Sequence, residues 1–335
     1  MNRRYIVYAM MATIVTLSSC AGEESEAEQS PPVPISVTVN SDHQPLTRND
    51  ETTPLTSTTL QSTGFGLYCQ PKSSTATYSP IMNNQKFTHN GSGWTYSPTK
   101  YWPNDNNTKL NFIAYAPYTT TKASYDNANS KFTYNYTINT TSPFDNIDLC
   151  TAVTPNRTSS DDDGKVPLTF QHQTARLDVQ VGINNATSGS KYFIQSVSIV
   201  TNSHNPETLH VGLSGDPSWT AESGASTLSY TISSFPVGIA DPGTSLTAGN
   251  FGDMTATLSS TATRVFPDAK YLTILPSTSS VDITVQYVEY SVSATTGLVE
   301  STVRTKTSSD VSLSDVTGGH RYTLNVTLDP STDQP

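Results

Sequence analysis

Residues 166–183 read VPLTFQHQTARLDVQVGI and contain two runs in which apolar and polar residues alternate. A period of two places the apolar side chains on one face of an extended chain, whereas a helix would repeat them every three or four residues. The stretch therefore predicts two neighbouring β-strands, each with one buried face. These faces consist of Val166, Leu168 and Phe170 in the first strand and of Leu177, Val179 and Val181 in the second.

The same alternation recurs along most of the chain. Short apolar runs are separated by Gly, Pro, Asn and Asp, which favour turns. Many strands at short spacing are typical of β-sandwiches rather than of a parallel α/β sheet. Further examples are ISVTVN at 35–40, KFTYNYTIN at 131–139, VDITVQYVEYSV at 281–292 and HRYTLNVTL at 320–328.

The composition favours an all-β fold in two domains. Only 14% of the residues are charged, and the 17 Tyr belong to a residue type that favours strands. The length of 335 residues suggests two domains. We place the boundary in GINNATSGS at 182–190, which gives two tandem sandwiches at 35–184 and 185–335.

Residues 94–118 form an aromatic segment, WTYSPTKYWPNDNNTKLNFIAYAPY. A turn at 103–107 predicts that this segment folds as a hairpin. Its aromatic side chains could stack on sugars, but such clusters more often fill the core of a sandwich. We favour the core.

The N-terminus has the pattern of an export signal. Arg3 and Arg4 precede a mostly apolar run over 5–17, which is too short for a membrane-spanning helix. LSSC at 17–20 resembles a bacterial lipobox, which implies that residues 1–19 are a signal peptide and that Cys20 carries the lipid, such as palmitate. The alternative is an ordinary signal peptide with an incidental cysteine.

The segment after Cys20 is acidic and rich in proline, and it has little to bury. Residues 20–34 are therefore expected to form an extended tether. Acidic residues directly after the lipidated cysteine also resemble the surface-export signal of Bacteroidetes lipoproteins.

The net charge argues against a nucleic-acid partner. The formal charge is −10, and loss of Arg3 and Arg4 with the signal peptide makes it −12. Phosphate neutralisation needs a basic surface. Any membrane attachment is expected through the lipid alone, because no later stretch is long and apolar enough to cross a bilayer.

The cysteines and histidines suggest neither catalysis nor a metal site. Cys69 and Cys150 could form a disulfide in an exported protein, although we favour two small buried residues on strands. The sequence contains no HExxH, GxSxG, CxxC or phosphate-binding loop motif. We therefore expect no enzyme, no cofactor and no metal.

Four segments in order resemble the fimbrillin-like proteins of Bacteroidetes, a superfamily of major and minor pilins. Residues 93–118 resemble the "W…YWP…L.F.AYAPY" segment of that family, and DNIDLCTA at 145–152 resembles "sDLm.A", with Cys150 where Met is usual. Residues 166–181 resemble "v.L.F.H..a+L.v.v", carrying His172 and Arg176, and GGHRYTLNVTL at 318–328 resembles "G..Y.l.v.l".

The resemblance implies two transthyretin-like sandwiches of Greek-key topology, a place at the outer membrane and cell surface in a fimbrium, and assembly by strand exchange. In the family, an Arg-specific protease removes the first strand of the lipoprotein precursor, and a strand of another subunit fills the groove. The displaced strand here would be 35–40, with Ile35, Val37 and Val39 inward. Full burial of these three side chains would stabilise the fold by about 5–9 kcal/mol. The expected cleavage lies between Arg48 and Asn49.

One departure from the family concerns the C-terminal end. Stalk pilins extend beyond the "Y.l.v.l" strand and donate that extension, whereas only DPSTDQP follows Leu328 here. We therefore expect a tip or accessory subunit, with other fimbrial subunits and host or bacterial surface ligands as partners. The alternative is a non-polymerising surface lipoprotein that binds a glycan or a host ligand.

Overall fold

The computed structural model describes residues 31–41, 57–72, 79–105, 107–254 and 257–335. Nearly all regular structure in these residues is β, which confirms the all-β class. One short helix, α1 (Ser57–Thr63), and two 3-10 turns, η1 (Asp161–Gly164) and η2 (Gly243–Ser245), complete the elements of the described chain. Residues 33–335 form one compact unit.

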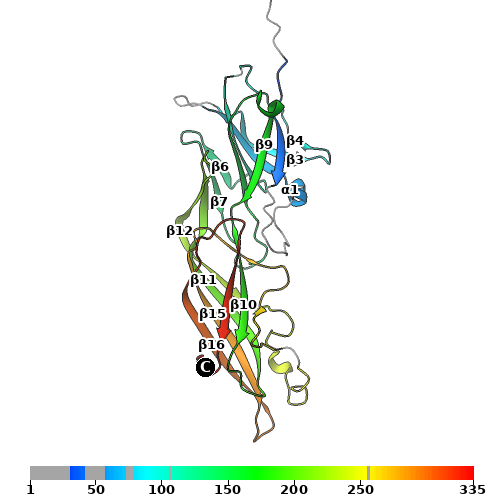
Figure 1. The fold of residues 1–335 in the computed structure, drawn as a ribbon, viewed down its shortest axis with the longest axis vertical. Helices are drawn as coiled ribbons and strands as arrows, with labels where there is room; N and C mark the ends of the chain where they lie inside the picture. Colours follow the sequence, from blue (N-terminus) through cyan, green and yellow to red (C-terminus); the bar gives the residue numbers. More distant parts are fainter. Residues whose placement is uncertain (1–30, 42–56, 73–78, 106, 255–256) are drawn as a thin grey trace, which may run out of the picture. The chain divides into compact units, whose positions relative to one another are not determined.

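A seven-stranded sheet makes up most of the first half of the described chain (Figure 1). Its neighbours pair antiparallel except for β1 and β9, which run parallel. In spatial order the strands are β1 (Ser36–Ser41), β9 (Lys165–His172), β8 (Cys150–Arg157), β5 (Leu110–Ala116), β2 (Phe65–Pro71), β3 (Met82–His89) and β4 (Trp94–Thr95).

A six-stranded sheet is built around the longest strand. That strand, β11, pairs with β12 on one side, and with β15 and β7 at different levels of the other. β16 extends the sheet beyond β15, and β6 extends it beyond β7. The strands are β6 (Ala123–Asp126), β7 (Lys131–Tyr136), β11 (Lys191–Val211), β12 (Pro217–Ile232), β15 (Ser280–Val292) and β16 (Val299–Ser312).

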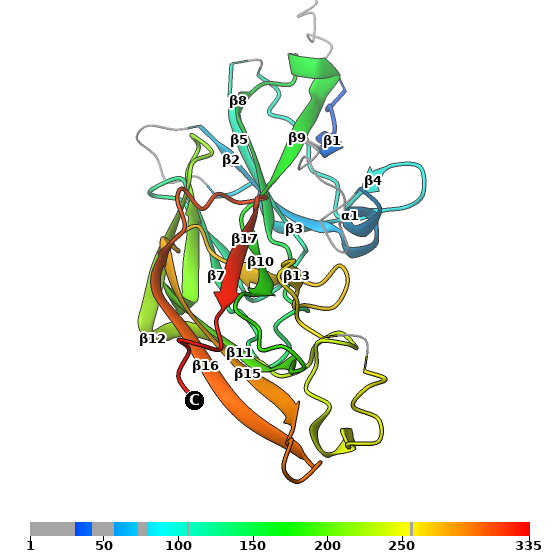
Figure 2. The same ribbon diagram turned by 60° about the horizontal axis from the view of Figure 1, so that its bottom comes forward.

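A four-stranded sheet has β10 at its centre. β10 (Ala175–Ile183) pairs antiparallel with β13 (Thr263–Arg264) and β14 (Leu272–Ile274), and parallel with β17 (Arg321–Leu328) (Figure 2). Strand pairing therefore crosses the expected domain boundary, because β7 and β10 precede residue 185 and pair with later strands. The division into two domains at 184/185 stays a prediction.

Two large apolar clusters fill the interior, and β5 contributes to both. Phe112 and Ala114 belong to the cluster enclosed by the seven-stranded sheet, which we call the β1 core. Ile113 and Tyr115, on the opposite face, belong to the larger cluster shared with β7, β10 and β11. The two faces of β5 thus agree with the alternation read from the sequence.

The predicted hairpin over 94–118 is wrong. β4 pairs with β3, while β5 pairs with β2 and β8. The intervening residues instead run along the start of β1, where Lys100 O accepts a hydrogen bond from Ile35 N (2.9 Å) and Trp102 N donates to Val33 O (2.9 Å). These contacts with a distant part of the chain have no signal in the local alternation.

Both cysteines are buried on strands and are free. Cys69 lies on β2 and Cys150 on β8, with β5 between them. Burial raises the pKa of both thiols well above the usual value, so each is held in the protonated form. The favoured interpretation as small buried residues is confirmed.

Candidate functional site

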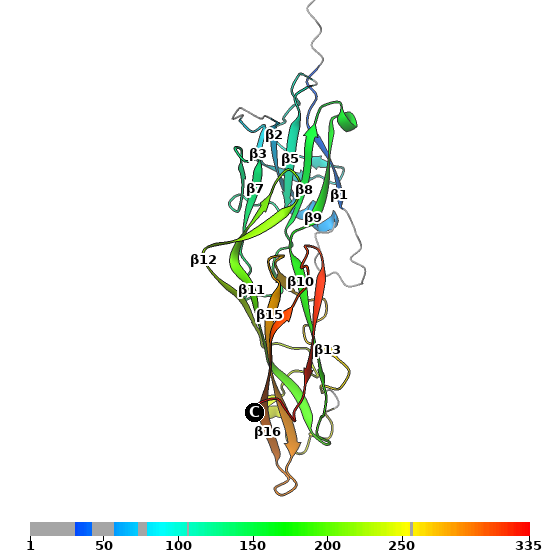
Figure 3. The ribbon, with the colours of Figure 1, turned by 60° about the vertical axis from the view of Figure 1, so that its left-hand side comes forward.

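β1 lies at the edge of the seven-stranded sheet, beside β9 (Figures 1 and 3). Six residue pairs join the two strands, from Ser36 opposite Lys165 to Ser41 opposite Phe170. Within the described chain, the regular ladder between β9 and β8 covers Gln171 and His172 alone. Residues 165–170 of β9 therefore have β1 as their ladder partner.

The alternation of β1 is as the sequence predicts. Ile35, directly before the strand, is 1% exposed, and Val37 and Val39 are half-buried against the β1 core. Ser36 and Thr38 point outward and are exposed. One of the three inward side chains is fully buried and two are half-buried, so together they contribute about 3–6 kcal/mol to the free energy of unfolding. This is less than full burial would give.

The apolar surface beneath β1 is continuous. Val166 and Leu168 of β9 are fully buried and Phe170 is 5% exposed, and all three belong to the β1 core. Removal of β1 would uncover part of this core together with the backbone groups of β9 that face it. An uncovered apolar groove with unpaired backbone groups is a template for another strand.

The start of β1 is fastened by residues outside the sheet. Tyr96 donates its hydroxyl hydrogen to Ile35 O (2.8 Å), and the indole of Trp102 donates to Gly164 O (3.0 Å). Gly164 has φ +73°, and a Cβ there would lie 3.2 Å from Val33 and 3.5 Å from the indole nitrogen. The positive φ favours glycine at this turn, and a Cβ there would also require the side chain of Val33 to shift.

Most of the aromatic segment belongs to the core. Trp102 and Tyr115 are buried, Trp94 and Tyr96 are half-buried against the β1 core, and Tyr101 is 48% exposed. This agrees with the core interpretation that the sequence favoured.

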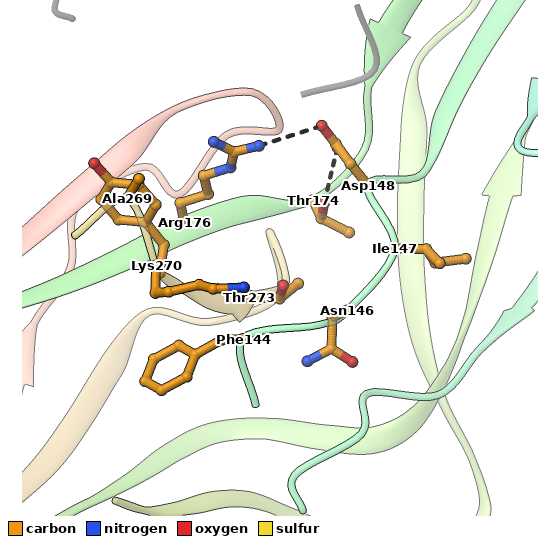
Figure 4. A pocket seen from close by; sticks show the side chains of 10 residues that line it. Phe144, Asn146, Ile147, Asp148, Thr174, Arg176, Ala269, Lys270 and Thr273 are labelled. Atoms are coloured by element: carbon orange, nitrogen blue, oxygen red, sulfur yellow. Dashed lines mark hydrogen bonds and ion pairs between the residues drawn. The ribbon is translucent and has the colours of Figure 1, made fainter. Parts of the chain in front are cut away.

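A second group of residues gathers at the far end of β9, where three of the four family-like segments meet. Asp148 Oδ2 lies 2.8 Å from His172 Nδ1. Asp148 Oδ2 also lies 3.7 Å from Arg176 Nη2, and Thr174 donates to Asp148 Oδ1 (3.4 Å) (Figure 4). His172 and Arg176 were identified from the sequence as part of the family-like segment 166–181, but the sequence did not indicate which residues they contact. Asp148 was missed, because one carboxylate within a short apolar segment carries no signal of its own.

The segment 318–320 closes over this group from the other half of the chain. Gly319 N donates to Thr174 O (2.8 Å) and Arg176 N donates to His320 O (2.9 Å). A Cβ on Gly318 would lie 2.1 Å from the carbonyl oxygen of His172, so only glycine fits against the backbone there.

Two cavities adjoin this junction. The pocket in Figure 4, lined by Phe144, Asp148 and Lys270 among others, has a volume of about 40 Å³, enough for a few water molecules. The second has a volume of about 490 Å³, within the range of small-ligand sites. Its lining includes Phe170, His172, Gln173, Pro217, Pro276, Val316 and His320.

Three expected site residues lie outside the described residues. These are Cys20, the predicted lipid attachment point, and Arg48 and Asn49, the predicted cleavage site. In the described residues no helix has the length and apolar character needed to cross a membrane.

Comparisons with known proteins point to one family. A family model described as fimbrillin-like matches residues 47–335. The fimbrium subunit Fim1C of Phocaeicola vulgatus is 28% identical over 213 residues, which are 57% of this chain and 55% of that protein, so the match spans about half the length of this curated relative. The crystal structure of a fimbrial protein from Bacteroides vulgatus has a similar fold, with a TM-score of 0.59 at 20% identity over 89% of this chain and 96% of that one.

Proposed function

The chain belongs to the fimbrillin-like family, and on that premise we propose that it is a structural and adhesive fimbrial subunit assembled by strand exchange at the β1 site. Its partners are other fimbrial subunits at the cell surface, where the fimbrium contacts host or bacterial ligands. The observation that carries the proposal is the edge position of β1, whose half-buried inward face covers the β1 core.

The route to assembly follows from the order of features along the chain. Cys20 precedes β1 and carries the lipid that delivers the precursor to the outer membrane. Arg48 follows β1 and precedes α1, so cleavage after it separates β1 from the rest of the molecule. The groove beneath β1 then receives a strand of a second subunit.

A tip or accessory position is supported by the contacts of residues 329–335. Asp333, which is 7% exposed, accepts hydrogen bonds from Tyr287 OH (3.0 Å) and Asp329 N (2.7 Å) and pairs with Lys306 Nζ (3.3 Å). Thr305 N of β16 donates to Gln334 O (2.7 Å). A segment held in this way by its own chain is a poor strand donor, which supports a subunit that accepts a strand and does not donate residues 329–335.

The first test is the N-terminus of the mature protein, measured by mass spectrometry on material from the cell surface. A start at Asn49 supports removal of β1. An acylated Cys20 with β1 retained in assembled fimbriae would contradict the exchange mechanism.

A second test locks β1 in place. The double substitution of Val37→Cys and Val166→Cys joins two register partners, and the disulfide should prevent incorporation into fimbriae until it is reduced. The matched control joins Val181→Cys and Val326→Cys in the parallel β10–β17 ladder, where a disulfide should leave incorporation unchanged. Equal incorporation of both locked proteins would overturn the proposal.

The alternative function is a surface lipoprotein that binds a glycan or host ligand without polymerising. The cavity of about 490 Å³ at the end of β9 favours this alternative, because its mixed apolar and polar lining is typical of ligand sites. Retained lipid on Cys20, together with saturable glycan binding that Val316→Trp abolishes, would establish it.

A further inference from the structure

Three donor atoms of different kinds converge where β8 meets β9. Asp148 Oδ2 lies 2.8 Å from His172 Nδ1, and Cys150 Sγ lies 3.3 Å from the same nitrogen. The donor atoms of Asp148, Cys150 and His172 all lie within 4.8 Å of one another. No other group of three such side chains meets this criterion in the described residues.

The sheet itself brings the three residues together. Cys150 and His172 are direct partners in the antiparallel β8–β9 ladder, so their side chains stand on the same face. Asp148 precedes Cys150 by two residues, the spacing that returns an extended chain to the same face. Cys150 and His172 are 22 residues apart on two strands, which is why no CxxC or helical His pair marks the cluster.

One hydrogen bond from His172 Nδ1 accounts for its contact with either Asp148 or Cys150, but not for both contacts. Nδ1 of an imidazole carries either one hydrogen or one lone pair, so it cannot complete full hydrogen bonds to the carboxylate and to the thiol at the same time. The two contacts also share one nitrogen, which differs from a catalytic triad, where the acid and the nucleophile contact opposite ring nitrogens. A cation, by contrast, can bond to all three donor atoms at once.

We propose that Asp148, Cys150 and His172 bind a zinc ion. Thiolate, imidazole and carboxylate are the donor set that zinc accepts, with bonds of about 2.3 Å to sulfur and about 2.0–2.2 Å to nitrogen and oxygen. Tetrahedral coordination would separate the nitrogen and oxygen by about 3.4 Å, so the donor atoms move apart by about 0.3–0.6 Å on binding.

The surroundings supply a fourth ligand and a route for the ion. His172 lines the cavity of about 490 Å³ and Asp148 lines the pocket of about 40 Å³, so space for water adjoins two of the three donor residues. Gln173 lines the same cavity as His172, and its buried side-chain oxygen is without a hydrogen-bond partner in the described part of the chain. A water molecule from the adjoining space completes the tetrahedron.

The two anionic donors match the charge of the ion. Zinc replaces the thiol hydrogen of Cys150, which leaves to solvent as a proton, so the thiolate and the Asp148 carboxylate together neutralise the ion. Arg176, 3.7 Å from Asp148, remains as an outer contact that orients the carboxylate. The bound ion would fasten β8 to β9 beside the segment 318–320.

The test uses the full chain with Cys20→Ala, so that Cys69 and Cys150 are the remaining thiols. Cobalt(II) is titrated first and read by its thiolate-to-metal absorption, and zinc is then added to displace it. One equivalent of cobalt should give this absorption, zinc should abolish it, and zinc should raise the melting temperature.

Matched variants decide the assignment. Cys150→Ala should lose the absorption and weaken zinc binding by at least about 100-fold, whereas Cys69→Ala, which removes the other buried thiol, should retain both. If Cys150→Ala does not fold, His172→Ala replaces it, because that side chain is 25% exposed and tolerates substitution better. The proposal would be overturned if the cobalt complex lacked the thiolate absorption. It would also be overturned if the Cys150→Ala or His172→Ala protein bound zinc as strongly as the protein with all three residues.

Discussion

In the described residues two ladders are parallel, β1–β9 and β10–β17, and they differ in how deeply the outer strand is buried. Six residue pairs join β1 to β9, and eight join β17 to β10. The inward side chains Leu324, Val326 and Leu328 of β17 are 4%, 6% and 0% exposed, whereas Val37 and Val39 of β1 are half-buried. The pairing mode is shared, so the two outer strands differ in the number of residue pairs and in how deeply their inward side chains are buried.

The inner strands of the two ladders, β10 and β9, also differ, because β10 has more pairing partners besides the outer strand. β10 pairs with β13 and β14 on the side away from β17, and most of its residues are buried. Residues 165–170 of β9 depend on β1 for their ladder within the described chain. Loss of β1 would thus expose the backbone of residues 165–170 to water, and this edge could then pair with another strand.

The largest effect should come from removing β1 altogether. A chain that begins at Asn49 should be less stable by about 3–6 kcal/mol, because the inward face of β1 no longer covers the β1 core. Urea unfolding measures the loss, and a synthetic peptide of residues 33–41 should reverse it. A peptide with Thr in place of Ile35, Val37 and Val39 is the control, and equal rescue by both peptides would refute the role of the inward face.

A smaller effect should distinguish the two ladders by single substitutions. Leu328→Ala in β17 should cost about 2–4 kcal/mol, since the side chain is fully buried. Val39→Ala in β1 should cost about 1 kcal/mol, since its side chain is half-buried. Chemical unfolding of both variants provides the comparison, and a larger cost for Val39→Ala would reverse our ranking of the two ladders.

Acid should weaken the six-stranded sheet through Glu289 of β15. Burial alone would raise the pKa of Glu289, but hydrogen bonds from Arg304, Tyr192 and Ser190 outweigh it and hold the pKa below its usual value. Because the folded pKa is the lower one, ionised Glu289 stabilises the fold at neutral pH, and this contribution is lost as the pH falls from about 5 towards 3. β1 and β9 contain no carboxylate on which acid could act in this way.

The measurement is the urea midpoint at pH 7 and at pH 3.5. The wild-type protein should lose more stability on acidification than Glu289→Gln does. Glu300→Gln, which changes an exposed carboxyl on the neighbouring strand β16, is the matched control and should behave as the wild type. If Glu289→Gln loses as much stability on acidification as the wild type, Glu289 is not a cause of the acid destabilisation.

The smallest effect is expected on the outward faces. Thr38 of β1 and Thr323 of β17 are both exposed, and replacing either by Ala should change stability by less than about 0.5 kcal/mol. If Thr38→Ala and Thr323→Ala both unfold at the midpoint of the wild type, the difference in stability between the two ladders must come from the inward residues. A large loss of stability in Thr38→Ala but not in Thr323→Ala would mean that the outer face of β1 also makes stabilising contacts.

The sequence by itself determined the all-β class, the strands of the opening stretch and their inward residues, and the family resemblance. Alternation is a local property, and the side chains of Val166, Leu168 and Phe170 lie buried where the pattern predicts them. The burial of Cys69 and Cys150 followed from their apolar neighbours for the same reason.

The tertiary structure alone decided the contacts between distant segments. It placed residues 96–102 against the start of β1 in place of a hairpin, and it paired β7 and β10 with strands beyond residue 185. It also brought Asp148 and Cys150 to His172, which the sequence could not indicate. Local patterns specify which face of a strand is buried, but the choice of neighbour depends on packing over the whole chain, and that choice assembles both the β1 groove and the Asp148–Cys150–His172 cluster.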